Sequence, residues 1–309
     1  MEIKRCDICG KEAIYYQRYN NKHLCKAHFI ESVEKRFFST VREFRMVRAN
    51  ETIAVALSGG KDSSVLLYLL SKLKKKMPID IIAITIDEGI KGYRDIEIQN
   101  AKSIAKKLGI KHYIFKFLEE IGYNIDDIVK MVKVAPCSYC GVFRRRLLNV
   151  KAKELGADKL AVGHNLDDAA QTLLLNITRN EPLRIGRYLS HIVEDEDFIP
   201  RIRPLIKIPE KEVSLYAYIK GIKWQFNECP YAKLSLRYTI RKKINEIEDK
   251  HPGAKFRMFS SLVTLSKIIK KSLDEKDKSI KKCKICGMPT SQDICMYCQK
   301  IEELKKLRR

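Results

Sequence analysis

The sequence has no long apolar segment, and this absence excludes a class of protein. Its longest apolar runs, such as Val65–Leu70 and Ile81–Ile86, are far too short to cross a bilayer. The N-terminal stretch Met1–Cys6 contains no apolar signal segment. The 309-residue chain, 45% hydrophobic, has enough apolar residues for a large core. We therefore expect a cytosolic α/β protein with no membrane contact.

Acidic residues are scarce relative to basic ones. The chain has 38 of the former and 61 of the latter, which gives a formal net charge of +23. A solvated lysine-rich surface is one explanation, but a matching glutamate content would then cancel the charge. The excess instead favours a polyanionic partner, and nucleic acid is the expected one.

Strands alternate with helices through the middle of the chain. Expected strands are 52–57, 80–86, 111–117, 159–162 and 222–226, and expected helices are 31–48, 63–73, 96–108, 167–177 and 231–247. This alternation predicts a doubly wound parallel sheet. The expected organisation is a metal module at 1–30, an α/β domain at 31–248, a basic helical linker at 249–280 and a second metal module at 281–309.

A glycine turn follows the first predicted strand of the α/β domain. The hexapeptide is Ser58, Gly59, Gly60, Lys61, Asp62 and Ser63, directly before a predicted helix. Glycines allow the backbone to approach phosphate closely, and the free N–H groups of a helix start point at it. The Walker pattern is absent. Asp62 beside phosphate suggests a role in holding Mg²⁺.

The segment Gly163–Asp168, with sequence GHNLDD, follows another predicted strand end. Together with the hexapeptide it resembles the N-type ATP pyrophosphatase (PP-loop) family, whose fold is adenine nucleotide alpha hydrolase-like. The resemblance implies ATP cleavage to AMP and pyrophosphate, with Gly163 at the nucleotide. Strand ends at Ala56 and Ile86 are expected to meet the adenosine. Asp168 is the preferred chemical residue, and helix N-capping is the alternative role for either Asp167 or Asp168.

Three cysteines lie inside the α/β domain at Cys137, Cys140 and Cys229. Three thiolates cannot complete a Cys₄ zinc site, but they can hold a [4Fe–4S] cluster with one open iron. They could also form a catalytic thiol with a resolving partner, or be buried reduced cysteines.

The PCxxCG pattern, the basic helix after it and the distant third cysteine resemble the TtuA/NcsA group of tRNA 2-thiouridine synthetases across essentially the whole chain. The resemblance implies that Cys137, Cys140 and Cys229 bind a [4Fe–4S] cluster. This group commonly has a catalytic lysine four residues after the second cysteine, where this chain has Arg144. Arginine can stabilise phosphate charge but cannot carry a proton near neutral pH.

Cysteine pairs also mark both ends of the chain. Cys6, Cys9, Cys25 and His28 have the spacing of a zinc site, with His23 as an alternative ligand. A second set has the same pairing and comprises Cys283, Cys286, Cys295 and Cys298. Structural disulfides are not expected in a cytosolic protein. We predict two closed, structural zinc sites.

The sequence thus predicts a tRNA uridine 2-sulfurtransferase that uses ATP, Mg²⁺, a [4Fe–4S] cluster and two Zn²⁺ ions. ATP would adenylate the uracil C2 oxygen, with Asp62, Arg144 and Asp168 as catalytic residues, and sulfur would then replace the oxygen. The expected sulfur donor is a thiocarboxylated ubiquitin-like protein or free sulfide, and the expected assembly is a homodimer. Alternatives are a lysidine-synthetase-like ligase and a zinc-based RNA-binding protein without catalysis.

Overall fold

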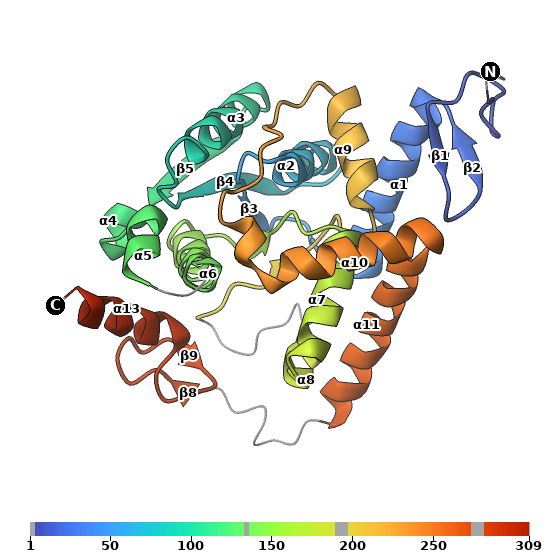
Figure 1. The fold of residues 1–309 in the computed structure, drawn as a ribbon. Coiled ribbons are helices and arrows are strands. Elements are labelled where there is room, and N and C mark those ends of the chain that lie inside the picture. Colours follow the sequence, from blue (N-terminus) through green and yellow to red (C-terminus); the bar gives the residue numbers. More distant parts are fainter. Residues whose placement is uncertain (1–3, 133–135, 189–196, 273–280, 309) are drawn as a thin grey trace.

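The protein is described by a computed structural model that covers residues 4–132, 136–188, 197–272 and 281–308. Its centre is a five-stranded parallel sheet in the order β5-β4-β3-β6-β7 (Figure 1). The strands are β3 (Thr52–Ala56), β4 (Asp80–Asp87), β5 (Lys111–Lys116), β6 (Lys159–Ala161) and β7 (Arg201–Ile202). The expected doubly wound α/β fold is confirmed. Within the described ranges, no helix is both long and apolar enough to cross a membrane.

Helices cover both faces of this sheet. Successive side chains of a strand point to opposite faces, and both sets are buried. Ile53 and Val55 of β3 belong to one apolar cluster, whereas Ala54 between them belongs to another. The first face carries α1 (Lys26–Glu43), α2 (Lys61–Lys74), α3 (Arg94–Lys107) and α9 (Glu210–Ile219). The second face carries α5 (Ile125–Met131) and α6 (Cys137–Glu154), with the short α4 (Phe117–Ile121) nearby.

The strand order reverses between β3 and β6. The chain moves outward from β3 through β4 to β5, and then returns to place β6 and β7 on the other side of β3. In open parallel sheets, ligands bind beyond the carboxyl ends of the strands at such a reversal. The two segments that follow β3 and β6 are Ser58–Ser63 and Gly163–Asp168. The fold therefore brings both sequence motifs to one crevice.

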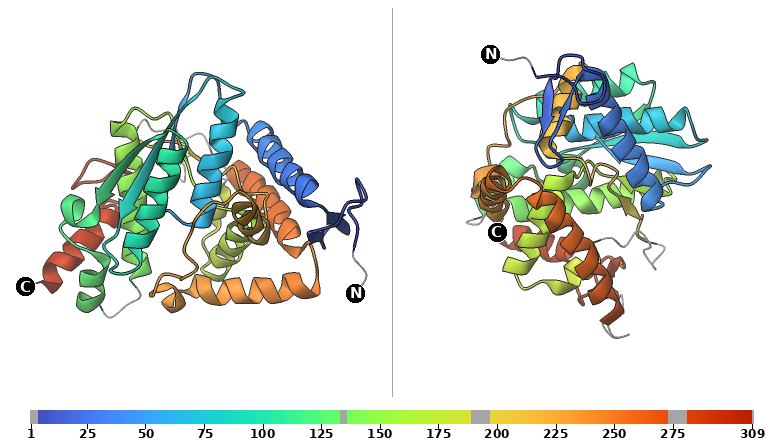
Figure 2. Two further views of the ribbon diagram at one scale, coloured as in Figure 1. Left: turned by 90° about the horizontal axis from the view of Figure 1, so that it is seen from above. Right: turned by 90° about the vertical axis from the view of Figure 1, so that its right-hand side faces the viewer.

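A helical layer completes the domain beside the sheet. It contains α7 (Leu166–Thr178), α8 (Pro182–Gly186), the 3₁₀ turn η1 (Ala232–Leu234), α10 (Leu236–Lys250) and α11 (Ala254–Ser272). Helix α11 packs on α7 and α8 (Figure 2), and Phe259 and Leu262 are buried there. Most of the range that the sequence predicts as a basic linker is therefore a packed helix. Residues 273–280 of that range lie outside the described residues.

Most elements agree with the sequence prediction, but one predicted strand is wrong. Residues 222–226 run without strand pairing between α9 and η1, so Cys229 does not end a strand. The predicted helix at 231–247 begins later, at Leu236, and the one at 31–48 starts earlier and ends at Glu43. Strand β7 was not predicted, because two residues are too short to show periodicity.

The two cysteine-rich ends fold as small modules on opposite sides of the molecule (Figures 1 and 2). The N-terminal module contains the hairpin β1 (Tyr15–Gln17) and β2 (Lys22–Leu24). The C-terminal module contains β8 (Lys281–Lys282), β9 (Pro289–Thr290) and α13 (Met296–Leu307). The first contacts α9 through Glu212, which is fully buried and accepts hydrogen bonds from Gln17, Tyr19 and Arg36.

Candidate active site

The loop after β3 is shaped by its own serines and by helix α3. The Ser58 hydroxyl accepts a hydrogen bond from the Gly60 N–H at 3.2 Å and lies 3.0 Å from the Ser63 hydroxyl. Gly59 adopts a positive φ of 90°, which an L side chain rarely adopts. A Cβ at Gly59 would lie 1.8 Å from the Glu97 carbonyl oxygen, so only glycine fits there.

The loop after β6 lies directly against the first one. A Cβ at Gly163 would lie 2.9 Å from the backbone nitrogen of Ser63. Asn165 donates a hydrogen bond from Nδ2 to the Asp62 carboxylate at 2.9 Å. Asn165 is also the N-cap of α7 and forms a capping box with Asp168. The structure thus brings together the two motifs, which lie about 100 residues apart in the sequence.

The adjacent acids Asp167 and Asp168 have different surroundings. Asp167 is buried, pairs with Lys255 of α11 and accepts a hydrogen bond from the Glu210 N–H at 2.8 Å. Asp168 keeps 31% of its side chain exposed, and its Oδ1 lies 3.8 Å from Arg237. Asp167 therefore joins α7, α9 and α11, whereas Asp168 faces the crevice.

A cavity of about 200 Å³ lies at this crevice. Its walls include Asp62, Asn165, Asp168, Glu210, Arg237 and Arg241. Burial raises the pKa of Asp168 to about 6, and the nearby Asp62 charge acts in the same direction. Desolvation also raises the pKa of Asp62, although Lys61 opposes this effect. Two carboxyls with raised pKa values in one cavity are typical of a functional site.

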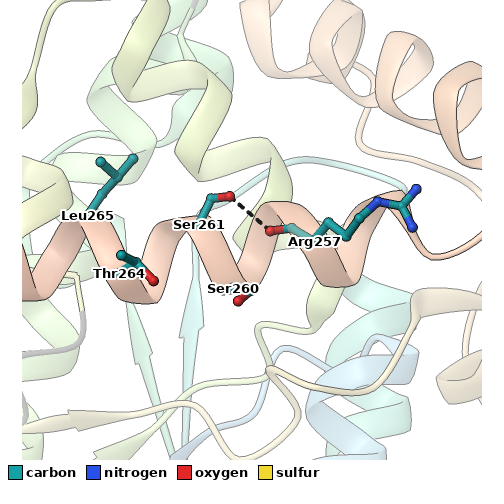
Figure 3. Close-up of a pocket in the computed structure, with 5 residues that line it drawn as sticks. All are labelled: Arg257, Ser260, Ser261, Thr264 and Leu265. Carbon is teal, nitrogen blue, oxygen red and sulfur yellow. Dashed lines mark hydrogen bonds between the residues drawn. The ribbon is translucent and has the colours of Figure 1, made fainter.

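A second depression, of about 440 Å³, lies on α11 (Figure 3). All five residues that line it belong to this one helix: Arg257, Ser260, Ser261, Thr264 and Leu265. No carboxylate, thiol or imidazole lines it. It therefore lacks the convergent chemical groups that the crevice has.

Lys61 links the nucleotide loop to α9. Its Nζ lies 2.8 Å from the Asp62 carboxylate and 2.8 Å from that of Glu210. Burial alone would lower the pKa of Lys61, but the two carboxylates raise it above the usual value. Lys61 therefore stays cationic, beside the loop that would bind phosphate. Glu210 also pairs with Arg241 at 3.2 Å, so α10 is tied to the same network.

Helix α3 adds a buried arginine that the sequence did not indicate. Arg94 donates to the Ser58 carbonyl at 3.0 Å and to the Ile86 carbonyl at 2.7 Å. It also pairs with Glu88 at 2.7 Å and with Glu97. The Ile86 backbone, predicted to meet adenosine, therefore has its carbonyl bound to Arg94. Ala56 ends β3 beside it, in register with Ile84 of β4.

Glu88 connects Arg94 to α6, the helix that carries Cys137 and Cys140. Its other oxygen lies 3.1 Å from the Arg144 guanidinium, which is 49% exposed. The interaction with Cys140 raises the pKa of Arg144 most, and the Glu88 carboxylate adds to this effect. Hydrogen bonds and ion pairs therefore connect the nucleotide loop to Arg94, Glu88 and Arg144.

The three central cysteines converge from two segments. Cys137 and Cys140 occupy the first turn of α6, and Cys229 lies in the extended segment before η1. The Cys137 Sγ lies 3.6 Å from the Tyr231 carbonyl, and Cys140 interacts electrostatically with both other thiols. Burial raises the pKa of Cys140 to about 11 and also raises the pKa of the other two. Bound cationic iron would favour the thiolates, which suits a cluster site.

The terminal cysteines form two tight ligand groups. Cys6, Cys9, Cys25 and His28 have ligand atoms within 4.8 Å of one another. The same holds for the second group, Cys283, Cys286, Cys295 and Cys298. Gly10 and Gly287 follow the first pair in each group and have positive φ values of 70° and 69°. Both groups could hold a metal ion, and His28, not His23, is the histidine of the first.

Two protein-family models together match residues 5–248 of this chain. A PP-loop domain model matches residues 30–248. A model described as "2-thiouridine synthetase TtuA, N-terminal LIM domain" matches residues 5–30. These two matches agree with the loop after β3 and with the first cysteine group. They also place the boundary between the N-terminal module and the next domain near the start of α1.

Similar proteins match over nearly their full length. A probable sulfurtransferase of Methanocaldococcus jannaschii is 41% identical over 99% of this chain and 90% of its own. The tRNA 2-thiolation protein NcsA of Haloferax volcanii is 37% identical over 97% and 99%. A solved structure, the U34-tRNA thiolase NcsA from Methanococcus maripaludis with its [4Fe-4S] cluster, has a TM-score of 0.85 and 35% identity, over 98% of this chain and 97% of that one. This chain therefore belongs to the TtuA/NcsA family of PP-loop tRNA 2-thiolation proteins.

Proposed function

We propose that this protein catalyses the ATP-dependent 2-thiolation of a uridine in tRNA. One observation carries the proposal: the Arg94–Glu88–Arg144 chain joins the nucleotide loop to α6, the helix that carries two of the three central cysteines. An ATP site alone would support many ligations. An ATP site next to three convergent thiols supports the activation of an oxygen followed by its replacement with sulfur. The similarity to tRNA thiolases supports the same reaction.

The nucleotide loop would bind the pyrophosphate part of ATP. Backbone N–H groups at the start of α2, the Ser58 and Ser63 hydroxyls and cationic Lys61 are all suited to phosphate oxygens. Asp62 would hold Mg²⁺ beside them, and the ion would balance phosphate charge. Attack of the uracil C2 oxygen on the α-phosphorus would give an adenylated uridine and release pyrophosphate. Asp168 faces the cavity where this oxygen would lie.

Cys137, Cys140 and Cys229 would hold a [4Fe–4S] cluster. Such a cluster would supply an iron without a protein ligand, at which inorganic sulfide can bind. Arg144 would stabilise the negative charge of the AMP leaving group, a role supported by its positive charge, its half-exposed side chain and its ion pair with Glu88. Replacement of the C2 oxygen would break its bond to C2, and AMP would carry that oxygen away.

The remaining parts of the proposal concern metals and partners. Both terminal ligand groups are proposed to hold structural Zn²⁺, because thiolate and imidazole ligands in closed sets of four suit this ion. The net charge of +23 supports tRNA as the substrate. We also propose a cytoplasmic location, which is supported by the similarity to a cytoplasmic tRNA 2-thiolation protein. A homodimer and a sulfur donor, either a thiocarboxylated ubiquitin-like protein or free sulfide, stay predictions of the family resemblance.

The deciding experiment is an anaerobic assay of the reconstituted protein. The protein would be incubated with unmodified tRNA transcript, ATP, Mg²⁺ and sulfide, and 2-thiouridine and AMP would be measured by mass spectrometry. We expect both products in equal amounts, and only when tRNA is present. Cys229→Ala should lose 2-thiouridine and the iron–sulfur absorption but should still bind tRNA.

Other outcomes would support the alternative functions. If Cys229→Ala released as much AMP on tRNA as the wild type, and neither protein formed 2-thiouridine, a lysidine-synthetase-like ligation would replace the sulfur reaction. If the wild-type protein stayed colourless and never consumed ATP, an RNA-binding role without catalysis would replace both. Analysis of tRNA nucleosides from a deletion strain would identify the uridine that is modified.

A further inference from the structure

Tyr139 is one of the two residues between the cysteines of α6. It lies between Cys137 and Cys140 in the sequence, and its side chain is fully buried. Its ring centroid lies 6.2 Å from that of Phe143, one turn further along α6. The first turn of α6 therefore has two sides, one with the thiols and one with an aromatic side chain packed into the protein.

The C-terminal module supplies the surface against which Tyr139 packs. Lys300 of α13 places its Nζ 4.2 Å from the centre of the Tyr139 ring. The Tyr297 ring lies 5.6 Å from that of Phe143 in an edge-to-face arrangement, and Arg146 lies over the same tyrosine at 5.5 Å. Figure 1 shows α13 lying beside α5 and α6. Helix α13 thus covers the outer side of the cysteine-bearing helix.

This packing is part of the core of the domain. Leu304 of α13 is fully buried in the same apolar cluster as Tyr139, Phe143 and Ile128. A polar contact between Lys282 and Asp197 at 3.2 Å adds a second attachment, but an exposed ion pair contributes little.

The covering residues are close to the C-terminal ligand group. Cys295 is the N-cap of α13, and Cys298 lies in its first turn. Tyr297 is the neighbour of Cys298, so an ion held by this group would fix the turn that carries Tyr297. The N-terminal module makes its described contacts with other helices, namely Glu212 of α9, Asp249 of α10 and Phe256 of α11.

We propose that the C-terminal module clamps the first turn of α6, so that a metal ion in this module holds Cys137 and Cys140 in position for the iron–sulfur cluster. The proposal rests on the proposed function, since it takes these cysteines as cluster ligands. It assigns Tyr297 as a positioning residue that acts through Phe143 and Tyr139. It also gives the two terminal modules different roles, because only the C-terminal one supports the cluster.

The test compares cluster lifetime in variants that keep all cysteines. Tyr297→Ala removes the ring over α6, and Tyr297→Phe keeps it. Tyr16→Ala is the matched control, because Tyr16 is an aromatic residue of the N-terminal module, stacked on His23. Each reconstituted protein would be exposed to air while iron–sulfur absorption is followed, and zinc would be counted by mass spectrometry. We expect at least fivefold faster cluster loss in Tyr297→Ala only, with zinc content unchanged.

The result that overturns the clamp is a Tyr297→Ala protein whose cluster lasts as long as that of the wild type. If Tyr297→Ala also lost zinc, the cluster lifetime of Leu304→Ala would be compared with that of the wild type instead, because Leu304 lies further from the zinc ligands. An unchanged lifetime in Leu304→Ala would overturn the clamp. A wild-type protein that never acquires cluster absorption would instead overturn the proposed function.

A second pair of variants tests the role of the ion directly. Cys298→Ser should release zinc from the C-terminal module and shorten the cluster lifetime. Cys9→Ser should release zinc from the N-terminal module and leave the cluster lifetime unchanged. Equal effects of the two substitutions would contradict a specific role for the C-terminal module.

Discussion

The terminal cysteine groups and the central cysteines are built in opposite ways. Each terminal group has four ligands within 4.8 Å of one another, and they come from two pairs of residues that are close in sequence. The central group has three thiols from two distant segments, and Arg144 on the same helix as two of them pairs with Glu88. A complete ligand set leaves no position for a reactant, whereas three thiols around a cluster leave one iron open. The difference predicts structural metal at the ends and chemistry in the centre.

Selective removal of each metal tests this comparison with the largest expected effect. A strong zinc chelator should unfold the terminal modules, since a structural zinc contributes on the order of 10 kcal/mol to local folding. Oxidative removal of iron should abolish thiolation and leave the thermal unfolding midpoint nearly unchanged. Limited proteolysis within residues 4–25 would detect unfolding of the N-terminal module after zinc loss. Calorimetry would measure the thermal unfolding midpoint after iron loss. A protein that unfolds on iron loss but not on zinc loss would reverse the comparison.

Arg94 tests whether the central site depends on its link to the nucleotide loop. Arg94→Met should raise the KM for ATP and lower kcat/KM by about 100-fold, because buried Glu88 and the Ser58 carbonyl lose their partner. Arg36→Met is a matched control, since Arg36 also pairs with a buried glutamate, Glu212, but far from the loop. Steady-state kinetics would compare the KM for ATP of the two variants, and their zinc and iron contents would show that both are correctly assembled. An unchanged KM in Arg94→Met would remove Arg94 from the site.

The pH dependence gives the smallest effect. Asp168 has a pKa raised to about 6, so its carboxylate is lost as the pH falls through that value. Activity that needs the charged form should therefore fall about tenfold for each pH unit below 6. The raised pKa also means that Asp168 favours the folded state at low pH, and this contribution is lost as the pH rises through about 6. A pH–rate profile of wild type and Asp168→Asn would check this, and a flat wild-type profile between pH 5 and 7 would contradict it.

Local sequence signals predicted the parts of the site that local structure determines. The hexapeptide at Ser58–Ser63 follows a buried strand, and the terminal ligands are close in sequence, so their spacing was sufficient. The contributions of Glu88 and Arg94 could not be predicted, because a charged residue before or within a helix usually faces solvent. Their roles depend on how α3 packs on Gly59 and how α6 approaches β4.

The same limit explains the remaining differences. Asp167 and Asp168 are neighbours of equal chemistry, and their roles differ because Lys255 and the Glu210 N–H contact Asp167 alone. The segment 222–226 has apolar residues typical of a strand, but the sheet already ends at β5 and β7. It instead passes Tyr93, whose carbonyl accepts a hydrogen bond from Gln225 at 3.0 Å. Such long-range contacts are absent from any short window of sequence.

The position of α13 also affects the order in which the protein matures during its synthesis. Chains fold from the N-terminus as they leave the ribosome, so the nucleotide loop and the parallel sheet can form early. The cover of the cysteine-bearing helix comes from residues 296–307, which are translated after every strand of the central sheet. A nascent chain would therefore have its sheet and nucleotide loop before it could protect an iron–sulfur cluster. Stable cluster insertion would then have to wait until residues 296–307 have folded.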